Sequence, residues 1–155
     1  MIIKRLIAAV CAVLVFMFAA TLPAAAQGIS KLRVQSAFPS SSLIYESSKY
    51  WAERVKAMTG GKLVIDLLPA GSVVPPFEVL DAVHKGVIDG AHSSAAYWVG
   101  KNRASTLFGP APGGPFGMDM LDYYGWLYEG GGLQLYRDFY QKELKRKVFV
   151  VPMGS

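Results

Sequence analysis

The sequence predicts an α/β fold with a mostly parallel sheet. From residue 27 onward, segments with the alternating polarity of strands take turns with segments of helical periodicity. Glycines stand where two of the helices are expected to end, at Gly60–Gly61 and at Gly86. The order strand, helix, strand, helix, strand at this spacing is typical of βαβ units, in which the strands run parallel.

The first βαβ unit is expected over residues 31–68. Residues 31–37 alternate in polarity as a strand does, and the serines that follow can cap a helix. Residues 43–58 have helical periodicity, and residues 62–68 form the second predicted strand. The helix is expected to turn its larger apolar side chains toward the core: Leu43, Tyr50, Trp51, Val55 and Met58.

The rest of the chain continues the alternation. A helix is expected from Pro75 to about Lys85, with Phe77, Val79, Leu80 and Val83 facing inward, and a third strand follows it. The remaining predicted elements are that strand at residues 87–92, a helix that begins in 93–99, a short strand at 107–108, helices at 119–128 and 133–144, and a final strand at 147–152.

The first 26 residues have the pattern of a bacterial secretory signal peptide. Lys4–Arg5 precede the apolar run Leu6–Ala20, and Ala24–Ala26 offer the small side chains of a cleavage site. Cleavage after Ala26 predicts an exported, periplasmic chain that starts at Gln27. An uncleaved membrane anchor is the alternative, because the apolar run together with the residues up to the cleavage site reaches the ~20 residues of a spanning helix.

Composition restricts the classes of function. The formal charge of +5 falls to +3 when Lys4 and Arg5 leave with the signal, which is too little to indicate nucleic acid as a partner. Cys11 is the sole cysteine, so the exported chain must fold without disulfides. The basic run Lys142–Lys147 is expected to be a solvated helix end, with a binding patch as the less favoured alternative.

The candidate ligand-binding residues follow the predicted strands. Ligands of a parallel sheet bind beyond the carboxyl ends of its strands. Phe38 follows the first strand, and Ser93, Ser94 and Tyr97 follow the third. The Tyr97 phenol can donate to a carboxylate while its ring excludes water, although the same ring could also be a core residue.

A fifth candidate lies in the glycine-rich segment 109–117, GPAPGGPFG. This segment is not a phosphate cradle, because Pro110, Pro112 and Pro115 lack the N–H donors that phosphate requires. Two interpretations stay open. The segment is either a rigid connection or a hinge-side loop that presents Phe116 to a ligand.

Neither a metal site nor a catalytic site is indicated. Asp81 and His84 are spaced to share a metal on one helix, but a third ligand with suitable spacing is missing, so a surface histidine is expected. A secreted hydrolase with a serine or carboxylate site in the βα loops is an alternative function, but a base is missing, no G-x-S-x-G motif occurs, and Ser93–Ser94 lack a glycine frame. A further alternative is an interaction module that docks through the helices in 119–144.

Several segments together resemble one family. Over essentially all of residues 27–155, the sequence is similar to the periplasmic solute receptors of tripartite ATP-independent (TRAP) transporters, the family of the dicarboxylate receptor. The segments that carry the resemblance are FPS at 38–40, YWA at 50–52, TGGK at 59–62, VLDAV at 79–83, KGVIDG at 85–90 and AAYWVGK at 95–101. GPFGM at 114–118 and WLYEGGG at 126–132 resemble the branch that binds 2-oxo acids and related monocarboxylates.

The resemblance implies a periplasmic-binding-protein type II-like fold, in which two α/β lobes close over a solute. Residues 27–155 then correspond to the first lobe, incomplete at its C-terminal end, and the second lobe is missing or truncated. The implied role is to capture an organic anion and deliver it to the TRAP permease, without catalysis; a homodimer is compatible with this role. No cofactor is expected within this chain.

The resemblance also implies which groups lie elsewhere. The carboxylate-clamping arginine of the family is expected beyond Ser155, and Arg103 and Arg137 are not expected to replace it. A sodium or calcium ion, if one binds, is expected to use residues of the second lobe in the full-length protein.

Overall fold

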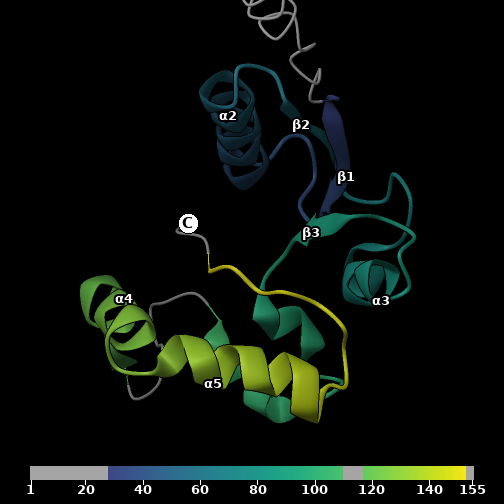
Figure 1. Cartoon of the computed structure of the whole chain (residues 1–155). Helices are drawn as coiled ribbons and strands as arrows, with labels where there is room; N and C mark the ends of the chain where they lie inside the picture. Colours follow the sequence, from purple (N-terminus) through teal and green to yellow (C-terminus); the bar gives the residue numbers. More distant parts are fainter. Residues whose placement is uncertain (1–27, 110–116, 153–155) are drawn as a thin grey trace, which may run out of the picture.

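The computed structural model describes residues 28–109 and 117–152 of the chain (Figure 1). The predicted signal peptide and the candidate residue Phe116 lie outside these ranges. Helix α2 (Leu43–Met58) and a three-stranded sheet lie in one half of the molecule, and helices α4 (Met120–Tyr128) and α5 (Gly132–Asp138) lie in the other (Figure 1). The predicted α/β class is confirmed.

All three strands run parallel, as predicted. β1 spans Ser30–Ser36, β2 spans Leu63–Leu68 and β3 spans Gly90–His92, in the order β2-β1-β3. A Cβ atom added to Gly90 would lie 3.3 Å from Val34 Cγ2, so the glycine allows β3 to approach the central strand closely. The parallel arrangement brings the carboxyl ends of all three strands to one edge of the sheet.

β3 is shorter than the six-residue strand predicted from residue 87. Asp89 N–H donates to the Arg33 carbonyl at 2.9 Å, and Arg33 N–H donates to Asp89 Oδ2 at 2.7 Å. The Asp89 side chain therefore takes the place of a ladder carbonyl. Ile88, only 1% exposed, lies in the core before the strand begins.

Helix α2 has the predicted bounds but buries a different face. Its buried residues are Tyr45, Ser48 and Ala52, whereas Leu43 and Met58 are 82% and 80% exposed and Tyr50 is 65% exposed. The prediction that these large apolar residues face the core is wrong. Small side chains let the helix backbone approach the sheet, and Tyr45 Oη donates to the β2 carbonyl of Leu67 at 3.3 Å.

The segment after β2 forms a 3₁₀ turn, Pro76–Glu78, and then α3, Val79–His84. Val79 and Leu80 are buried in the main core, as predicted, and Val83 packs against that core. Phe77 is 62% exposed, so its predicted inward orientation is wrong. It lies in the 3₁₀ turn that precedes α3, where the chain has not yet taken up the α-helical periodicity that the prediction assumed.

Two predicted elements are 3₁₀ helices in the structure. The helix expected in 93–99 is a 3₁₀ helix over Ala95–Trp98, and Leu107–Phe108, expected as a strand, ends the 3₁₀ helix Arg103–Phe108. Asn102 begins this second helix by accepting from Ala104 N–H at 2.9 Å. Phe108 then packs against the rings of Tyr136 and Phe139, with centroid distances of 4.8 and 5.2 Å.

The two C-terminal helices confirm the sequence prediction. Asp119 caps α4 by accepting from Asp122 N–H at 2.8 Å, and α5 continues into a π-helical turn, Phe139–Glu143. The turn between α4 and α5 depends on Gly131, whose φ of 83° is left-handed. Within the described ranges, no helix is both long and apolar enough to span a membrane.

The predicted final strand at residues 147–152 is not a strand, because it pairs with none of the three described strands. Its side chains nevertheless alternate as those of a strand do: Val148 and Val150 pack against the core, while Phe149 and Val151 are 72% and 62% exposed. In Figure 1 this segment runs back from the end of α5 toward the middle of the molecule.

Candidate functional site

The loops that follow the three strands are joined to one another at the carboxyl edge of the sheet. Ala37 N–H donates to the His92 carbonyl at 2.8 Å, which links the end of β1 to the end of β3. Ala70 N–H donates to the Phe38 carbonyl at 3.1 Å, which links the loop after β2 to the same place. This edge is where ligands of a parallel sheet are expected to bind.

A buried glutamine, which the sequence analysis did not identify, holds the loop after β2. Gln35 is 0% exposed, and its Oε1 accepts from Val73 N–H at 2.9 Å and from Val74 N–H at 3.1 Å. Its Nε2 donates to the Val74 carbonyl at 2.7 Å. One side chain therefore satisfies three backbone groups of a loop that borders the candidate site.

Four rings cluster at this edge. Phe38 lies 5.3 Å from His92 and 6.0 Å from Tyr97, and Phe77 lies 4.8 Å from Tyr97, all between ring centroids. The structure therefore brings together the predicted candidates Phe38 and Tyr97. It adds Phe77, which was predicted to be a core residue, and His92, which is not among the predicted candidates. The cluster forms an apolar and weakly polar wall of the kind that lines ligand sites.

The two serine candidates differ in their surroundings. Ser94 Oγ accepts from Ala96 N–H at 3.3 Å and so caps the 3₁₀ helix that carries Tyr97. Ser93 Oγ is buried and has no hydrogen-bond partner in the described part of the chain. Ser94 Oγ therefore has a structural role, whereas Ser93 Oγ is buried and unpaired among the described residues. Phe116, the fifth candidate, falls outside the described residues.

A serine–histidine contact beside the site is not a catalytic pair. Ser48 Oγ lies 2.7 Å from His92 Nδ1, but Ser48 is only 1% exposed, so a substrate cannot reach it. The same hydroxyl donates to the Ile44 carbonyl at 2.9 Å. Burial lowers the pKa of His92, which favours its neutral form. This contact therefore gives the hydrolase alternative no support, since Ser48 would be an inaccessible nucleophile.

The site is tied to the second half of the molecule through buried polar rings. Trp98, next to Tyr97, donates from Nε1 to Tyr140 Oη at 2.7 Å, and Tyr136 Oη lies 3.4 Å from Tyr140 Oη. Burial raises the pKa of both tyrosines above the usual range, so both hydroxyls remain protonated. The 3₁₀ helix that carries Tyr97 is thereby fixed against the π-helical turn that continues α5.

Asp81 and His84, which the sequence spaces like a pair of metal ligands, both have other partners in the structure. Asp81 forms ion pairs with Lys101 at 2.7 Å and Arg146 at 2.8 Å, and His84 Nδ1 accepts from Lys147 N–H at 3.0 Å. Burial raises the pKa of the Asp81 carboxyl, but the two cations outweigh it and hold that pKa below the usual value. No cluster of three or more metal-ligating side chains occurs in residues 28–109 and 117–152.

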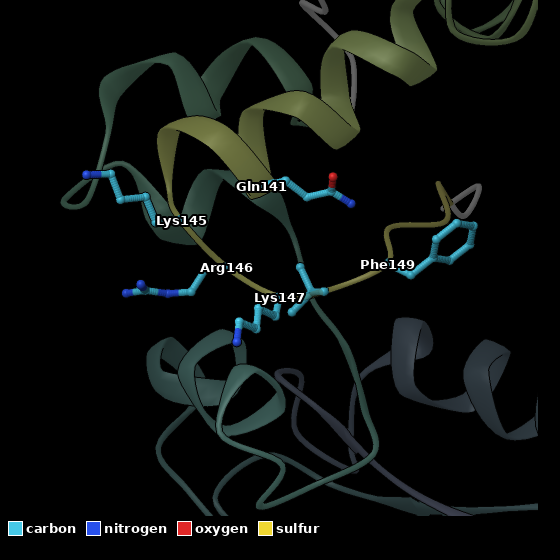
Figure 2. A pocket seen from close by; sticks show the side chains of 6 residues that line it. Gln141, Lys145, Arg146, Lys147 and Phe149 are labelled. Atoms are coloured by element: carbon cyan, nitrogen blue, oxygen red, sulfur yellow. The ribbon is translucent and has the colours of Figure 1, made fainter.

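The basic run at the end of the π-helical turn borders an open groove of about 480 Å³ (Figure 2). In Figure 2 the side chains of Lys145 and Arg146 point to one side of the groove and that of Phe149 to the other. Lys142 pairs with Asp138 at 2.8 Å. Arg146 pairs with Asp81 at 2.8 Å, so at least one cation of the run is not simply solvated, and the solvated helix end stays a prediction. The groove is lined by Gln141, Lys145, Arg146, Lys147, Val148 and Phe149.

Comparisons with known proteins assign the family of this chain. Residues 34–146 match the model of the bacterial extracellular solute-binding proteins, family 7 (DctP). The chain belongs to this family. The matched range begins within β1 and includes all of β2 and β3. It also includes the whole aromatic cluster.

Individual relatives agree with the family match. The chain is 36% identical over 108 residues to the monocarboxylate 2-oxoacid-binding periplasmic protein all3028 of Nostoc sp. (strain PCC 7120), which covers 70% of this chain and 29% of that protein. A TRAP transporter solute-binding protein of Bordetella bronchiseptica, crystallised with calcium and picolinate, is 32% identical with a TM-score of 0.67. One from Pseudoalteromonas atlantica, with bound sodium and pyruvate, is 30% identical with a TM-score of 0.66.

The chain spans about a third of the length of these relatives. Each of the two structural matches covers 74% of this chain and 34% of the other chain. The fold class is thereby confirmed as that of an α/β domain of TRAP solute-binding proteins. The relatives are binding proteins of transport systems rather than enzymes.

Proposed function

We propose that this chain functions in a periplasmic solute receptor of the TRAP type, which captures a small organic carboxylate and delivers it to a membrane permease. The observation that supports this proposal most directly is the wall formed by Phe38, Phe77, Tyr97 and His92 at the carboxyl edge of a parallel sheet. The 2-oxo acids and related monocarboxylates are the favoured class of solute, because relatives bind 2-oxo acids or pyruvate.

The proposed roles within the edge follow from the contacts. The rings of Phe38 and Tyr97 exclude water from the apolar part of the solute, and the Tyr97 phenol donates a hydrogen bond to its carboxylate. Ser93 belongs to the set of solute-binding residues that the sequence predicts, although its Oγ is buried in this structure. Ser94 and Phe116 complete the set of solute-binding residues that the sequence predicts. The receptor performs no chemistry on the solute.

A cation is part of the proposal only outside the described residues. Relatives bind calcium or sodium together with their ligand. The described ranges of this chain contain no group of three potential ligands that fits such an ion, and Asp81 is already paired with Lys101 and Arg146. We therefore assign none of the described side chains to a cation.

Export is the second part of the proposal. The positive end, apolar run and alanine triplet of residues 1–26 direct the chain to the periplasm, where the permease and, in one compatible arrangement, a second copy of the receptor are its partners. Mass spectrometry of periplasmic material is expected to show a chain that starts at Gln27. Recovery of a chain that retains Met1 in the membrane fraction would contradict this prediction.

Isothermal titration of the whole gene product tests the binding function. Pyruvate and other 2-oxo acids are expected to bind, and Tyr97→Phe is expected to lose ~0.5–1.5 kcal/mol of binding free energy, since it removes one hydrogen bond. Tyr50→Phe is the matched control, because Tyr50 is 65% exposed on α2 and is expected to leave affinity unchanged. An esterase assay runs beside the titration. Hydrolysis of the ester substrate without any binding of carboxylates would contradict the receptor function and favour an enzyme.

A further inference from the structure

The extended segment 147–152 begins at a junction that α3 holds in place. The chain leaves the π-helical turn through Lys145, whose φ of 53° lies in the left-handed region that residues other than glycine rarely adopt. A strained turn of this kind persists only where its surroundings fix it. Here the surroundings include Asp81 and His84 of α3, which contact the two residues that follow Lys145.

The two contacts from α3 differ in kind. Asp81 Oδ1 forms an ion pair with Arg146 Nη2 at 2.8 Å. His84 Nδ1 accepts a hydrogen bond from the backbone N–H of Lys147 at 3.0 Å. Because a backbone N–H can only donate, Nδ1 must present its lone pair, and the single proton of the neutral ring must be on Nε2. A second proton on the ring would go to Nδ1 and abolish this hydrogen bond.

Only one of these two contacts depends on pH near neutrality. Histidine is the side chain that ordinarily changes its charge between about pH 5 and 8. Burial raises the pKa of the Asp81 carboxyl, but its ion pairs with Lys101 and Arg146 outweigh burial and hold that pKa below the usual value. Asp81 therefore stays ionised over the same range. As the pH falls, the junction loses the His84 acceptor and keeps the Asp81 ion pair.

The other charged groups do not compensate for the lost acceptor. They come from α3, from the junction, and from the segment after the 3₁₀ helix Ala95–Trp98. These groups are Asp81, Lys85, Lys101, Arg146 and Lys147. The single carboxylate of this set already pairs with two cations, so a protonated His84 adds a further positive charge beside a surplus of positive charge. Repulsion from the cations of the junction then acts in the same direction as the lost hydrogen bond.

We propose that His84 is a proton-sensitive latch for the segment 147–152. The neutral ring ties Lys147 to α3, and the protonated ring releases the start of the segment, so that the strained turn at Lys145 can relax. The release is local, because the Asp81–Arg146 ion pair and the packing of Val148 and Val150 keep the segment near the core. The latch is independent of the proposed solute site.

An NMR titration of the whole gene product tests the latch in the unaltered protein. The chemical shifts of the Lys147 amide and of the His84 ring are expected to change with one common midpoint. Protection of that amide from hydrogen exchange, corrected for the intrinsic effect of pH, is expected to fall about three- to tenfold as the ring gains its proton. A Lys147 amide that does not follow the His84 ring would overturn the proposal.

Two substitutions of His84 separate the acceptor from the ring. His84→Asn places an amide oxygen near the position of Nδ1, and because this oxygen does not titrate, the Lys147 amide is expected to stay protected throughout the titration. His84→Phe keeps a ring without an acceptor, and the amide is expected to be unprotected at every pH. Lys85→Gln, at the exposed neighbouring position, is the matched control and is expected to keep the common midpoint.

Limited proteolysis at a single pH tests the release of the segment. Trypsin cleaves after lysine and arginine, and the junction Lys145–Lys147 offers three such sites. At about pH 7.5, where an ordinary imidazole is neutral, His84→Phe is expected to be cut at the junction about three- to tenfold faster than the unaltered protein, and His84→Asn at the unaltered rate. Equal rates for His84→Phe and the unaltered protein, both folded by circular dichroism, would overturn the proposal. If His84→Phe does not fold, the titration of the unaltered protein decides.

Discussion

Two glycines of the α4–α5 hairpin are expected to respond in opposite ways to the same substitution. A Cβ atom added to Gly132, at the start of α5, would lie 2.7 Å from Trp126 Cδ2 and 2.8 Å from Cε3. Atoms in real structures do not approach so closely, so the indole would have to move. The same atom added to Gly125, inside α4, would meet nothing within 4 Å.

The size of each effect follows from the surroundings. The Trp126 ring is packed against Tyr123 and Phe108, at centroid distances of 5.8 and 6.4 Å, so its displacement disturbs the aromatic core. Overpacking of this kind costs about 1–3 kcal/mol, and we expect Gly132→Ala to destabilise the fold by that amount. Gly125→Ala removes the flexibility of a glycine from a helix interior and is expected to stabilise the fold by roughly 0.5–1 kcal/mol.

Urea unfolding followed by tryptophan fluorescence measures both variants. At a slope of about 2 kcal/mol per molar urea, Gly132→Ala is expected to lower the midpoint by about 0.5–1.5 M, and Gly125→Ala to raise it by a few tenths. The opposite signs distinguish a specific clash from a general effect of alanine. Equal midpoints for the unaltered protein and Gly132→Ala would refute the reasoning about the Trp126 contact.

Three further predictions concern the buried polar groups. Gln35→Leu is expected to cost about 2–4 kcal/mol of folding free energy, because Val73 and Val74 N–H lose their acceptor, while Gln141→Leu on the surface leaves urea unfolding unchanged. Tyr140→Phe strips the acceptor from the buried Trp98 Nε1 and is expected to cost about 1–3 kcal/mol, with the 55% exposed Tyr128→Phe as control. Burial lowers the pKa of His92 in the folded protein, so the unfolded chain binds the proton more readily. The free energy of unfolding is therefore expected to fall as pH drops below about 6.5 toward the folded pKa. His92→Gln is expected to weaken this pH dependence, as measured by urea unfolding at a series of pH values.

The sequence predicts the order of elements better than it predicts their faces. The alternation of strand and helix signals places β1, α2 and β2 within a residue or two of their observed bounds. The prediction of which face of α2 is buried is wrong. Hydrophobicity alone favours Leu43, Tyr50 and Met58, whereas packing against the sheet requires small side chains at Ser48 and Ala52. Closeness of approach between two backbones is a tertiary property that a hydrophobic pattern does not contain.

The candidate site was predictable to the extent that topology determines it. Parallel strands place Phe38 and Tyr97 at one edge whatever the details of packing, and the two rings do lie together. The sequence does not single out His92 or Gln35, because their partners are distant in the chain. Ser48 lies 44 residues from His92, and Val73 and Val74 lie 38 and 39 residues from Gln35. A polar residue flanked by buried strand positions, as Gln35 is, was the one signal in the sequence that could have indicated a structural hydrogen-bond network.

The charge of the proposed solute places a further demand on the receptor. A carboxylate in an apolar site requires charge-assisted donors, and the edge supplies the rings of Phe38, Phe77 and His92 and the ring and hydroxyl of Tyr97. Two described arginines are committed elsewhere: Arg146 pairs with Asp81 at 2.8 Å, and Arg137 stacks over Phe149 at 4.6 Å from the ring centroid. If the receptor function is correct, the cationic partner of the carboxylate is therefore neither of these. The edge described here then determines the shape of the solute and its hydrogen-bonding class, and a separate group determines its charge.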